Sequence, residues 1–268
     1  MLVQHFWQYY FNILDAGDSR TANYLFVRDP KFVMISIVLY LTMVFAGPKF
    51  MRNRKALNLR MVLIIYNFLS VLFSIWMLWE FLVSIILDKT FNLLCQHVEE
   101  NDTRLLTIRL IDVHWWYFFS KFLEFIDTFF FVVRKKNNQI SFLHTYHHVS
   151  MLLLQWGLIK FAPGGASTIG PIFNTFIHAV MYTYYMLAAV GPHMQKYLWW
   201  KKYLTRMQMG QFILIFAFCA NSIYACQHGT RVIFFWIHLV YMVTLFMLFS
   251  NFYQTSYNTK NKQQCKED

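Results

Sequence analysis

The chain has 268 residues and a formal net charge of +11, yet only 14% of its residues are charged, while 57% are hydrophobic and 20% aromatic. A soluble domain is about a quarter charged, so this composition excludes an ordinary soluble protein and indicates several membrane helices. The basic residues lie in short blocks between apolar runs. That pattern is typical of membrane topology signals and argues against a nucleic-acid partner.

Apolar runs follow one another along the whole chain. A spanning helix needs roughly 20 mostly apolar residues, so we expect an all-α, polytopic membrane protein with seven transmembrane helices in one domain, residues 1–268. The third, fourth and fifth runs contain polar residues and have the weakest hydropathy. The expected helices cover residues 32–47, 61–87, 113–133, 140–161, 169–190, 207–226 and 232–252.

The charges of the loops predict the orientation of the chain. Fifteen lysines and arginines fall on one side, in residues 48–60, 134–139, 191–206 and 253–268. Only seven fall on the other side, in residues 1–31, 88–112, 162–168 and 227–231. Because basic residues are enriched in cytosolic loops, we expect a cytosolic C-terminus and an N-terminus on the opposite side.

Two features of the expected non-cytosolic loops agree with this orientation. Asn101-Asp102-Thr103 is an N-glycosylation sequon between the second and third helices. Cys95 lies in the same loop, and Cys226 lies at the non-cytosolic end of the sixth helix. An oxidising compartment would favour a bond between these cysteines. We therefore predict a glycan on Asn101 and a Cys95–Cys226 disulfide.

Three histidines stand together at the start of the fourth expected helix. His144, His147 and His148 are spaced i, i+3 and i+4, which places them on one helical face, a few residues after Gln139. Ionisable side chains inside a membrane are costly and indicate a functional site. Two chemistries remain open: imidazoles that bind iron or zinc, and imidazoles that act as nucleophile or base.

Polar side chains also line one face of each of three neighbouring expected helices. Residues spaced by three, four or seven positions lie on the same face of a helix. Each face has two interpretations, a polar stripe that joins helices or part of a functional site. The residues are Lys121, Glu124, Asp127 and Thr128 in the third helix, Asn174, His178 and Tyr182 in the fifth, and Gln208 and Gln211 in the sixth. We expect these faces to meet in one chamber.

Basic residues surround the expected cytosolic mouth of this chamber. They are Arg134, Lys135 and Lys136 in one loop and Lys201 and Lys202 in another. Such a mouth suits the phosphates of a carrier such as coenzyme A, and the apolar interior suits an acyl chain. Anionic lipid headgroups would attract the same loops.

Together the motifs resemble those of the very-long-chain fatty acid elongase family, the membrane condensing enzymes of the endoplasmic reticulum. The resemblance extends from the first expected helix to the last. Its most specific stretches are Lys121-Phe-Leu-Glu124-Phe-Ile-Asp127-Thr128, Gln139…His144-Thr-Tyr146-His147-His148, Asn174…His178…Tyr182…Tyr185 and Thr205…Gln208…Gln211.

The resemblance implies a seven-helix enzyme that encloses an acyl-chain tunnel and condenses long-chain acyl-CoA with malonyl-CoA to 3-ketoacyl-CoA, CoA and CO₂. It also implies a site without metal or cofactor. His147 is then the expected nucleophile, and His178 positions the malonyl unit. Either Asp127 or Glu124 sets an imidazole tautomer. Separate roles for His144 and His148 do not follow from the pattern.

The family resemblance also implies residence in the endoplasmic reticulum membrane, with the N-terminus lumenal. The reductases and dehydratase of the elongation cycle are expected partners, and a homodimer is a further expectation. Lys266 is third from the end of the chain, but Gln264 stands where a KxKxx retention signal needs lysine. Residence therefore needs a basis other than that signal.

Two other classes of protein compete with this interpretation. A di-iron desaturase or hydroxylase needs about eight histidine ligands, whereas only the 144–148 cluster and His178 are suitably placed here; two irons per chain would identify that class. A seven-helix receptor or transporter would place its ligand chamber toward the outside. Signalling or flux without acyl-CoA turnover would identify it.

Overall fold

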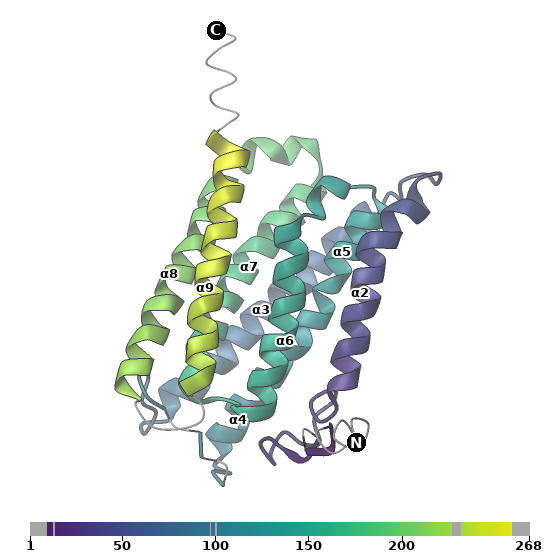
Figure 1. Cartoon of the computed structure of the whole chain (residues 1–268). Coiled ribbons are helices and arrows are strands. Elements are labelled where there is room, and N and C mark those ends of the chain that lie inside the picture. The colour runs from purple at the N-terminus through teal and green to yellow at the C-terminus, as the bar shows by residue number, and fades with distance from the viewer. Residues whose placement is uncertain (1–9, 13, 97, 100, 227–231, 259–268) are drawn as a thin grey trace. The chain divides into compact units, whose positions relative to one another are not determined.

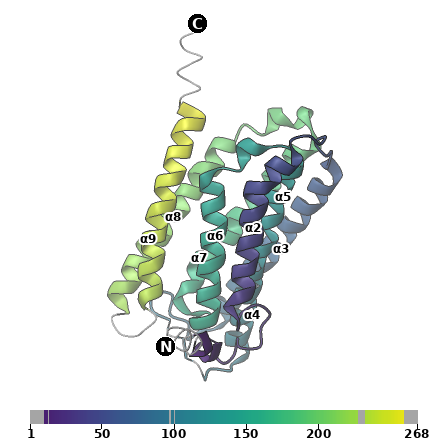
Figure 2. The same ribbon diagram turned by 45° about the vertical axis from the view of Figure 1, so that its right-hand side comes forward.

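The computed structural model describes residues 10–12, 14–96, 98–99, 101–226 and 232–258. Within these ranges the chain is helical and contains no strand, which confirms the all-α prediction. The α-helices from α2 onward are α2 (Pro30–Met51), α3 (Arg60–Leu87), α4 (Leu105–Leu123), α5 (Phe125–Val133), α6 (Phe142–Phe161), α7 (Ile169–Val190), α8 (Lys201–Ala225) and α9 (Val232–Tyr253). Figures 1 and 2 show them from two directions.

Short helices connect or extend several of these elements. They are η1 (Asn137–Gln139), η2 (Gly165–Thr168), η3 (Pro192–Tyr197) and η4 (Gln254–Asn258). η1 lies directly before the histidine-bearing α6, and η3 lies before α8. The two expected basic loops are therefore partly ordered by helical turns.

Among the described residues, four helices are long and apolar enough to cross a membrane: Pro30–Met51, Arg60–Leu87, Lys201–Ala225 and Val232–Tyr257. They correspond to the first, second, sixth and seventh expected spans. The three polar runs between them are also helical, as α4 with α5, α6 and α7. The protein is thus a multi-pass membrane protein, and the count of seven spans stays a prediction.

The chain packs as two compact units. Unit 1 contains residues 1–58 and 80–168, and unit 2 contains residues 59–79 and 169–268. Helix α3 therefore contributes its first part to unit 2 and its end to unit 1. The single domain that the sequence predicts stays a prediction.

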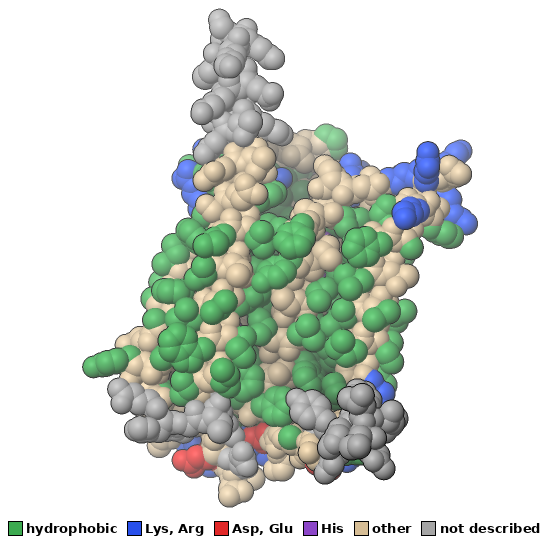
Figure 3. Space-filling model, in the orientation of Figure 1, with side chains coloured by type: hydrophobic (Ala, Val, Ile, Leu, Met, Phe, Trp, Pro, Cys, Tyr) green, Lys and Arg blue, Asp and Glu red, His purple; other side chains and the backbone are tan. Residues whose placement is uncertain are grey.

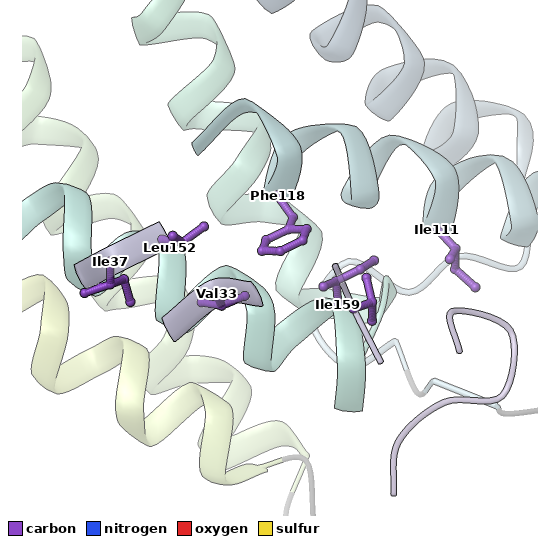
Figure 4. Packing of buried hydrophobic residues seen from close by; sticks show 7 residues of the cluster. Val33, Ile37, Ile111, Phe118, Leu152 and Ile159 are labelled. Atoms are coloured by element: carbon purple, nitrogen blue, oxygen red, sulfur yellow. The ribbon is translucent and has the colours of Figure 1, made fainter. Parts of the chain in front are cut away.

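Unit 1 is built around helices α2, α4, α5 and α6. α2 packs on α5 and α6, and α4 packs on α6. Its apolar core includes Ile111, Phe118, Leu152 and Ile159, all nearly inaccessible to solvent. Figure 4 shows these side chains with those of α2. The core fixes α4 and α6 against each other, and these two helices carry much of the candidate site.

Close packing of α2 against α5 depends on Gly47. A Cβ atom on Gly47 would lie 2.7 Å from Cγ1 of Val132. That distance is shorter than any ordinary contact between carbon atoms. The absence of a side chain at this position therefore lets the two helices approach.

In unit 2, α8 packs along α9 and α7 packs on α8. α8 and α9 run side by side in both ribbon views (Figures 1 and 2). A cluster of Tyr184, Leu198 and Leu204 closes the end at which η3 leads into α8. This packing places the start of α8 next to the end of α7.

Exposed hydrophobic side chains cover the outer faces of the long helices, as expected for contact with lipid. On α2 these include Val38, Leu39 and Phe45, and on α3 they include Trp79 and Ile86. In Figure 3, green hydrophobic side chains cover the visible helix faces, and lysines and arginines gather around the loop after α2.

Candidate active site

The polar face of the third expected span is interrupted at Glu124. α4 ends at Leu123 and α5 begins at Phe125. At the junction the backbone N–H of Asp127 donates to the carbonyl of Glu124, three residues earlier, at 3.2 Å. Periodicity alone predicted one continuous helix over 113–133. The break gives Glu124 its own position between the two helices.

A buried ion pair lies at this break. Nζ of Lys121 donates to Oε1 of Glu124 at 2.6 Å, and both side chains are almost fully buried. The ammonium group also lies 4.3 Å from the ring centre of Tyr117. Burial of a charge is tolerated only with such compensation, so these contacts explain how a lysine persists in an apolar bundle.

The first histidine of the cluster is held by a threonine from α5. Nε2 of His144 lies 2.7 Å from Oγ1 of Thr128. Thr128 is fully buried and donates its hydroxyl proton to the hydroxyl of Tyr40 at 3.2 Å. Thr128 then accepts from His144, which places a proton on Nε2 of that imidazole.

The third histidine of the cluster faces the buried glutamate. Nδ1 of His148 lies 3.9 Å from Oε2 of Glu124. The other carboxylate oxygen, Oε1, is the one that accepts from Lys121. The ring centres of His144 and His148 are 4.3 Å apart, and those of His147 and His148 are 5.5 Å apart. The three imidazoles therefore form one packed cluster, as their spacing predicted.

Local sequence explains why α6 begins where it does. Ser141 has extended backbone angles and its side chain accepts from the N–H of His144 at 3.2 Å, an N-cap contact. Aromatic rings surround the histidine cluster. Tyr40 stacks on Phe125 with ring centres 4.2 Å apart, and the ring centres of Phe131 and His144 are 5.3 Å apart. We did not identify Ser141 or Tyr40 from the sequence, although a serine three residues before the first histidine is a recognisable N-cap signal.

The basic turn after α5 has a defined conformation. Lys135 adopts a positive φ of 56°, and the N–H groups of Lys135 and Lys136 donate to the carbonyls of Val132 and Phe131. These two bonds form a Schellman motif, with lysine at the position that usually holds glycine. Nζ of Lys135 also donates to the carbonyl of Arg52 at 3.0 Å, so it joins the loops after α2 and α5.

The remaining members of this turn are more accessible. Lys136 and Gln139 are exposed and Arg134 is half-buried. Asp127 is also half-buried, one turn beyond the ion pair. Unit 1 thus contains the histidine cluster, the ion pair and one basic loop of the predicted site.

Unit 2 contains the polar face of α7. Asn174 and Tyr182 are buried and His178 is half-buried, whereas Tyr185 is 40% exposed. The ring centre of Tyr182 lies 5.8 Å from that of His178 and 6.1 Å from that of Tyr66, in edge-to-face geometry. The ring of Tyr182 therefore packs between those of His178 and Tyr66.

The glutamines of α8 differ in their surroundings. Gln211 is buried, and Nε2 of Gln208 lies 3.8 Å from the sulfur of Met181 on α7. Lys201 and Lys202 are exposed at the start of α8. The convergence of the histidine cluster with the α7 face in one chamber stays a prediction.

Metal coordination was one of the two chemistries left open for the histidines. In the part of the chain that the structure describes, no group of three or more histidine, cysteine or acidic side chains is arranged to hold a metal ion. The hydrogen bond of His144 to Thr128 occupies Nε2 of that ring, and the choice between the two chemistries stays a prediction.

The expected non-cytosolic loop is held by charged contacts. Asn101 is exposed in a turn. Asp102 accepts from the Arg104 guanidinium at 2.7 Å, and hydrogen bonding to Arg104 holds the pKa of the Asp102 carboxyl well below its usual range.

The cysteines differ in their state. Cys95 and Cys226 are both disulfide-bonded, while Cys219 is a free, buried thiol. The pairing of Cys95 with Cys226 and the glycan stay predictions.

Comparisons with known proteins identify relatives over nearly the whole chain. The model of the ELO family, described as GNS1/SUR4, matches residues 25–265. Very long chain fatty acid elongase 7 of Drosophila melanogaster is 43% identical over 91% of this chain and 74% of its own length. Elongase 5 of Tachysurus fulvidraco is 40% identical over 100% and 89%, and elongase 4 of Mus musculus is 41% identical over 90% and 77%.

Proposed function

Since the chain belongs to the GNS1/SUR4 family and is a fatty acid elongase, we propose that it catalyses the condensing step of elongation. In this step a long-chain acyl-CoA and malonyl-CoA give 3-ketoacyl-CoA, CoA and CO₂. The observation that carries the proposal is the packed histidine cluster, with His144 held by Thr128 and His148 facing Glu124.

The nucleophile in this mechanism is His147. Its neutral imidazole attacks the thioester carbonyl, the carbon–sulfur bond breaks, and CoA leaves as a thiolate that takes up a proton. Malonyl-CoA then loses CO₂, and the resulting enolate attacks the acyl-imidazole carbonyl. The new carbon–carbon bond forms as His147 is released. No step changes the oxidation state of the enzyme, so the reaction consumes no redox cofactor.

Neighbouring groups position the imidazoles. Glu124 is assigned the role of accepting the Nδ1 proton of His148 through Oε2, while its Oε1 accepts from Lys121. Thr128 orients His144. Two of the three rings are therefore fixed by residues next to the α4–α5 break, and this rigidity favours attack from one geometry.

The polar face of α7 is assigned to the second substrate. His178 stabilises the malonyl enolate, and Asn174, Tyr182 and Tyr185 orient that imidazole and the substrate carbonyl. Gln139, Gln208 and Gln211 complete the polar lining. Arg134, Lys135, Lys136, Lys201 and Lys202 are assigned to the CoA phosphates. The geometry of α7 supports this assignment, because Tyr182 contacts His178 directly.

The proposed setting is the endoplasmic reticulum membrane, with seven helices around an acyl-chain tunnel and the reductases and dehydratase of the cycle nearby. The relatives named elongase 4, 5 and 7 have almost the same sequence identity to this chain, 41%, 40% and 43%. Family membership therefore does not select a chain length, and a panel of substrates is needed.

The test uses the full-length protein purified in detergent without added metal. It is incubated with acyl-CoAs of increasing chain length and radiolabelled malonyl-CoA, and labelled 3-ketoacyl-CoA is measured. We expect product from the wild type and at least about 100-fold less from His147→Ala, because a general catalyst or nucleophile is lost. An acyl adduct on the peptide that contains His147 should appear when malonyl-CoA is omitted.

His193→Ala is the matched control, since this imidazole is exposed in η3. It should retain wild-type turnover. Persistence of the acyl adduct in His147→Ala would assign the nucleophile elsewhere. Absence of product with every chain length, in folded wild-type protein, would reject condensation as the activity.

A further inference from the structure

A tyrosine of α2 lies against the histidine cluster. Tyr40 is buried, with 2% of its surface exposed, and α2 packs on both α5 and α6. Its ring stacks on Phe125 with centres 4.2 Å apart, and its centre lies 6.1 Å from that of His148. Packing explains the ring. The buried hydroxyl needs a separate explanation, because phenylalanine would fill the same space without a polar group to satisfy.

Tyr40 is one end of a chain of hydrogen bonds that leads to His144. Thr128 donates its hydroxyl proton to the oxygen of Tyr40 at 3.2 Å, and its Oγ1 lies 2.7 Å from Nε2 of His144. All three residues belong to unit 1. A hydroxyl has a single proton, so Thr128 cannot donate to both neighbours at once. While Tyr40 takes that proton, Nε2 of His144 must be the donor.

The direction of this chain is set at its tyrosine end. The side chain of Thr145 is the other hydrogen-bonding neighbour of the Tyr40 hydroxyl. Thr145 can take the phenolic proton, which leaves a lone pair of Tyr40 for Thr128. Without the Tyr40 hydroxyl, Nε2 of His144 would be the remaining hydrogen-bond partner of Thr128 among the described residues. The threonine would then donate to Nε2, and the neutral imidazole would carry its proton on Nδ1 instead.

We propose that Tyr40 is a positioning residue of the condensing reaction, which acts through Thr128 to hold His144 as the tautomer protonated on Nε2. The assignment rests on the proposed function for the reaction that it serves. It also separates His144 from its neighbours in the cluster. A ring nitrogen that donates its proton to Thr128 has no lone pair with which to attack a thioester. His144 therefore positions the cluster, and attack is left to another imidazole.

The packing of the rings carries this effect to the nucleophile. The ring centres of His144 and His148 are 4.3 Å apart in edge-to-face geometry, and those of His148 and His147 are 5.5 Å apart. A change of tautomer exchanges the protonated and unprotonated nitrogens of His144, and so changes the electrostatic surface that His148 meets. Tyr40 has no assigned contact with substrate. Its loss should therefore lower kcat and leave KM unchanged.

The direct test measures the tautomer itself. Full-length protein with isotope-labelled histidine nitrogens is studied by NMR in phosphatidylcholine nanodiscs at about pH 8, where a free imidazole is neutral. Protonated and unprotonated ring nitrogens differ widely in chemical shift, and the spectrum of His144→Gln identifies the signals of this residue. We expect a protonated Nε2 in the wild type. In Tyr40→Phe, which keeps the stack on Phe125, the proton should move to Nδ1.

A kinetic cycle tests whether Tyr40 acts through Thr128. Tyr40→Phe should lower kcat of condensation about tenfold, the lower end of the effects of removing a group that orients a ligating imidazole. Thr128→Val removes the link, so adding Tyr40→Phe in that background should have no further effect. Thr128→Ser restores the hydroxyl and should keep the wild-type tautomer and kcat.

Tyr184→Phe is the matched control. It also removes the hydroxyl of a buried tyrosine, here in unit 2, and keeps the ring that packs edge-to-face on Trp200. It should keep the wild-type tautomer and kcat. Melting temperatures of all variants, measured in the same nanodiscs, show whether each is folded.

An unchanged His144 spectrum in folded Tyr40→Phe would overturn the proposal, and so would a wild-type His144 protonated on Nδ1. Losses of kcat in Tyr40→Phe and Thr128→Val that multiply in the double variant would also overturn it, because Tyr40 would then act independently of Thr128. The tautomer is measured without substrate or turnover. A tautomer that depends on Tyr40, in a protein that makes no 3-ketoacyl-CoA, would reject the condensing step and leave the control of His144 by Tyr40 standing.

Discussion

At the scale of single residues, spacing predicted which side chains share a face but not which atoms meet. The i, i+3 spacing of Lys121 and Glu124 predicts their ion pair. The contacts of Glu124 with His148 and of Thr128 with His144 join α4 and α5 to α6. They depend on how helices distant in sequence pack, which no local pattern contains.

The ion pair leads to a prediction about stability. Glu124→Gln leaves the ammonium of Lys121 buried without its carboxylate, so we expect a loss of about 3–5 kcal/mol in unfolding free energy. Replacing both residues, as Lys121→Met with Glu124→Leu, removes the uncompensated charge and should recover most of that loss. Thermal unfolding of the detergent-solubilised variants measures both effects.

Glu80→Gln is the control for this cycle. Glu80 pairs with Arg109 at 2.5 Å, but that pair is partly exposed and should contribute about 1 kcal/mol or less. A double variant as unstable as Glu124→Gln alone would show that the pair does more than neutralise charge. Condensation activity should stay low in the double variant, because His148 has lost its partner.

At the scale of elements, composition predicted helices well and their ends less well. α9 was expected over 232–252 and ends at Tyr253, because its apolar run is uninterrupted. α8 was expected from 207 but begins at Lys201, since its first turns are polar and packed through Leu204. The break at Glu124 has no proline or glycine to announce it, so periodicity could not reveal it.

The close approach of α2 and α5 gives a prediction about packing. Gly47→Ala places a methyl group 2.7 Å from Cγ1 of Val132, a stiff β-branched residue that is itself buried. We expect a loss of about 1–3 kcal/mol from overpacking. Val132→Ala in the same chain should recover part of the loss by making space for the methyl group.

Gly210→Ala in α8 is the matched control, because no atom lies within 4 Å of the added Cβ. It should be neutral or stabilising by up to roughly 1 kcal/mol, since alanine favours helix more than glycine does. Melting temperatures of the three variants compare these effects. Equal losses in Gly47→Ala and Gly210→Ala would indicate a general intolerance of helix changes rather than a clash.

At the scale of the whole molecule, charge is distributed unevenly along the chain. All acidic residues except Glu267 and Asp268 occur at or before Asp127, whereas basic blocks occur throughout. This distribution explains why the loop charges predict an orientation, whereas the apolar helices alone identify only which segments can cross a membrane. Orientation is a property of the chain in its membrane and needs a measurement there.

The last prediction concerns that orientation. With a lumenal N-terminus and a cytosolic C-terminus, Cys265 should react with a membrane-impermeant maleimide in sealed microsomes, and Asn101 should carry a glycan removable by glycosidase. Cys219 is buried and Cys95 and Cys226 are disulfide-bonded, so Cys265→Ser should abolish labelling. Asn101→Gln should abolish the glycosidase-sensitive mass. If Cys265 reacts only after permeabilisation, the orientation is inverted. The basic loops assigned to CoA would then face the lumen instead of the cytosol, which contradicts the condensation model.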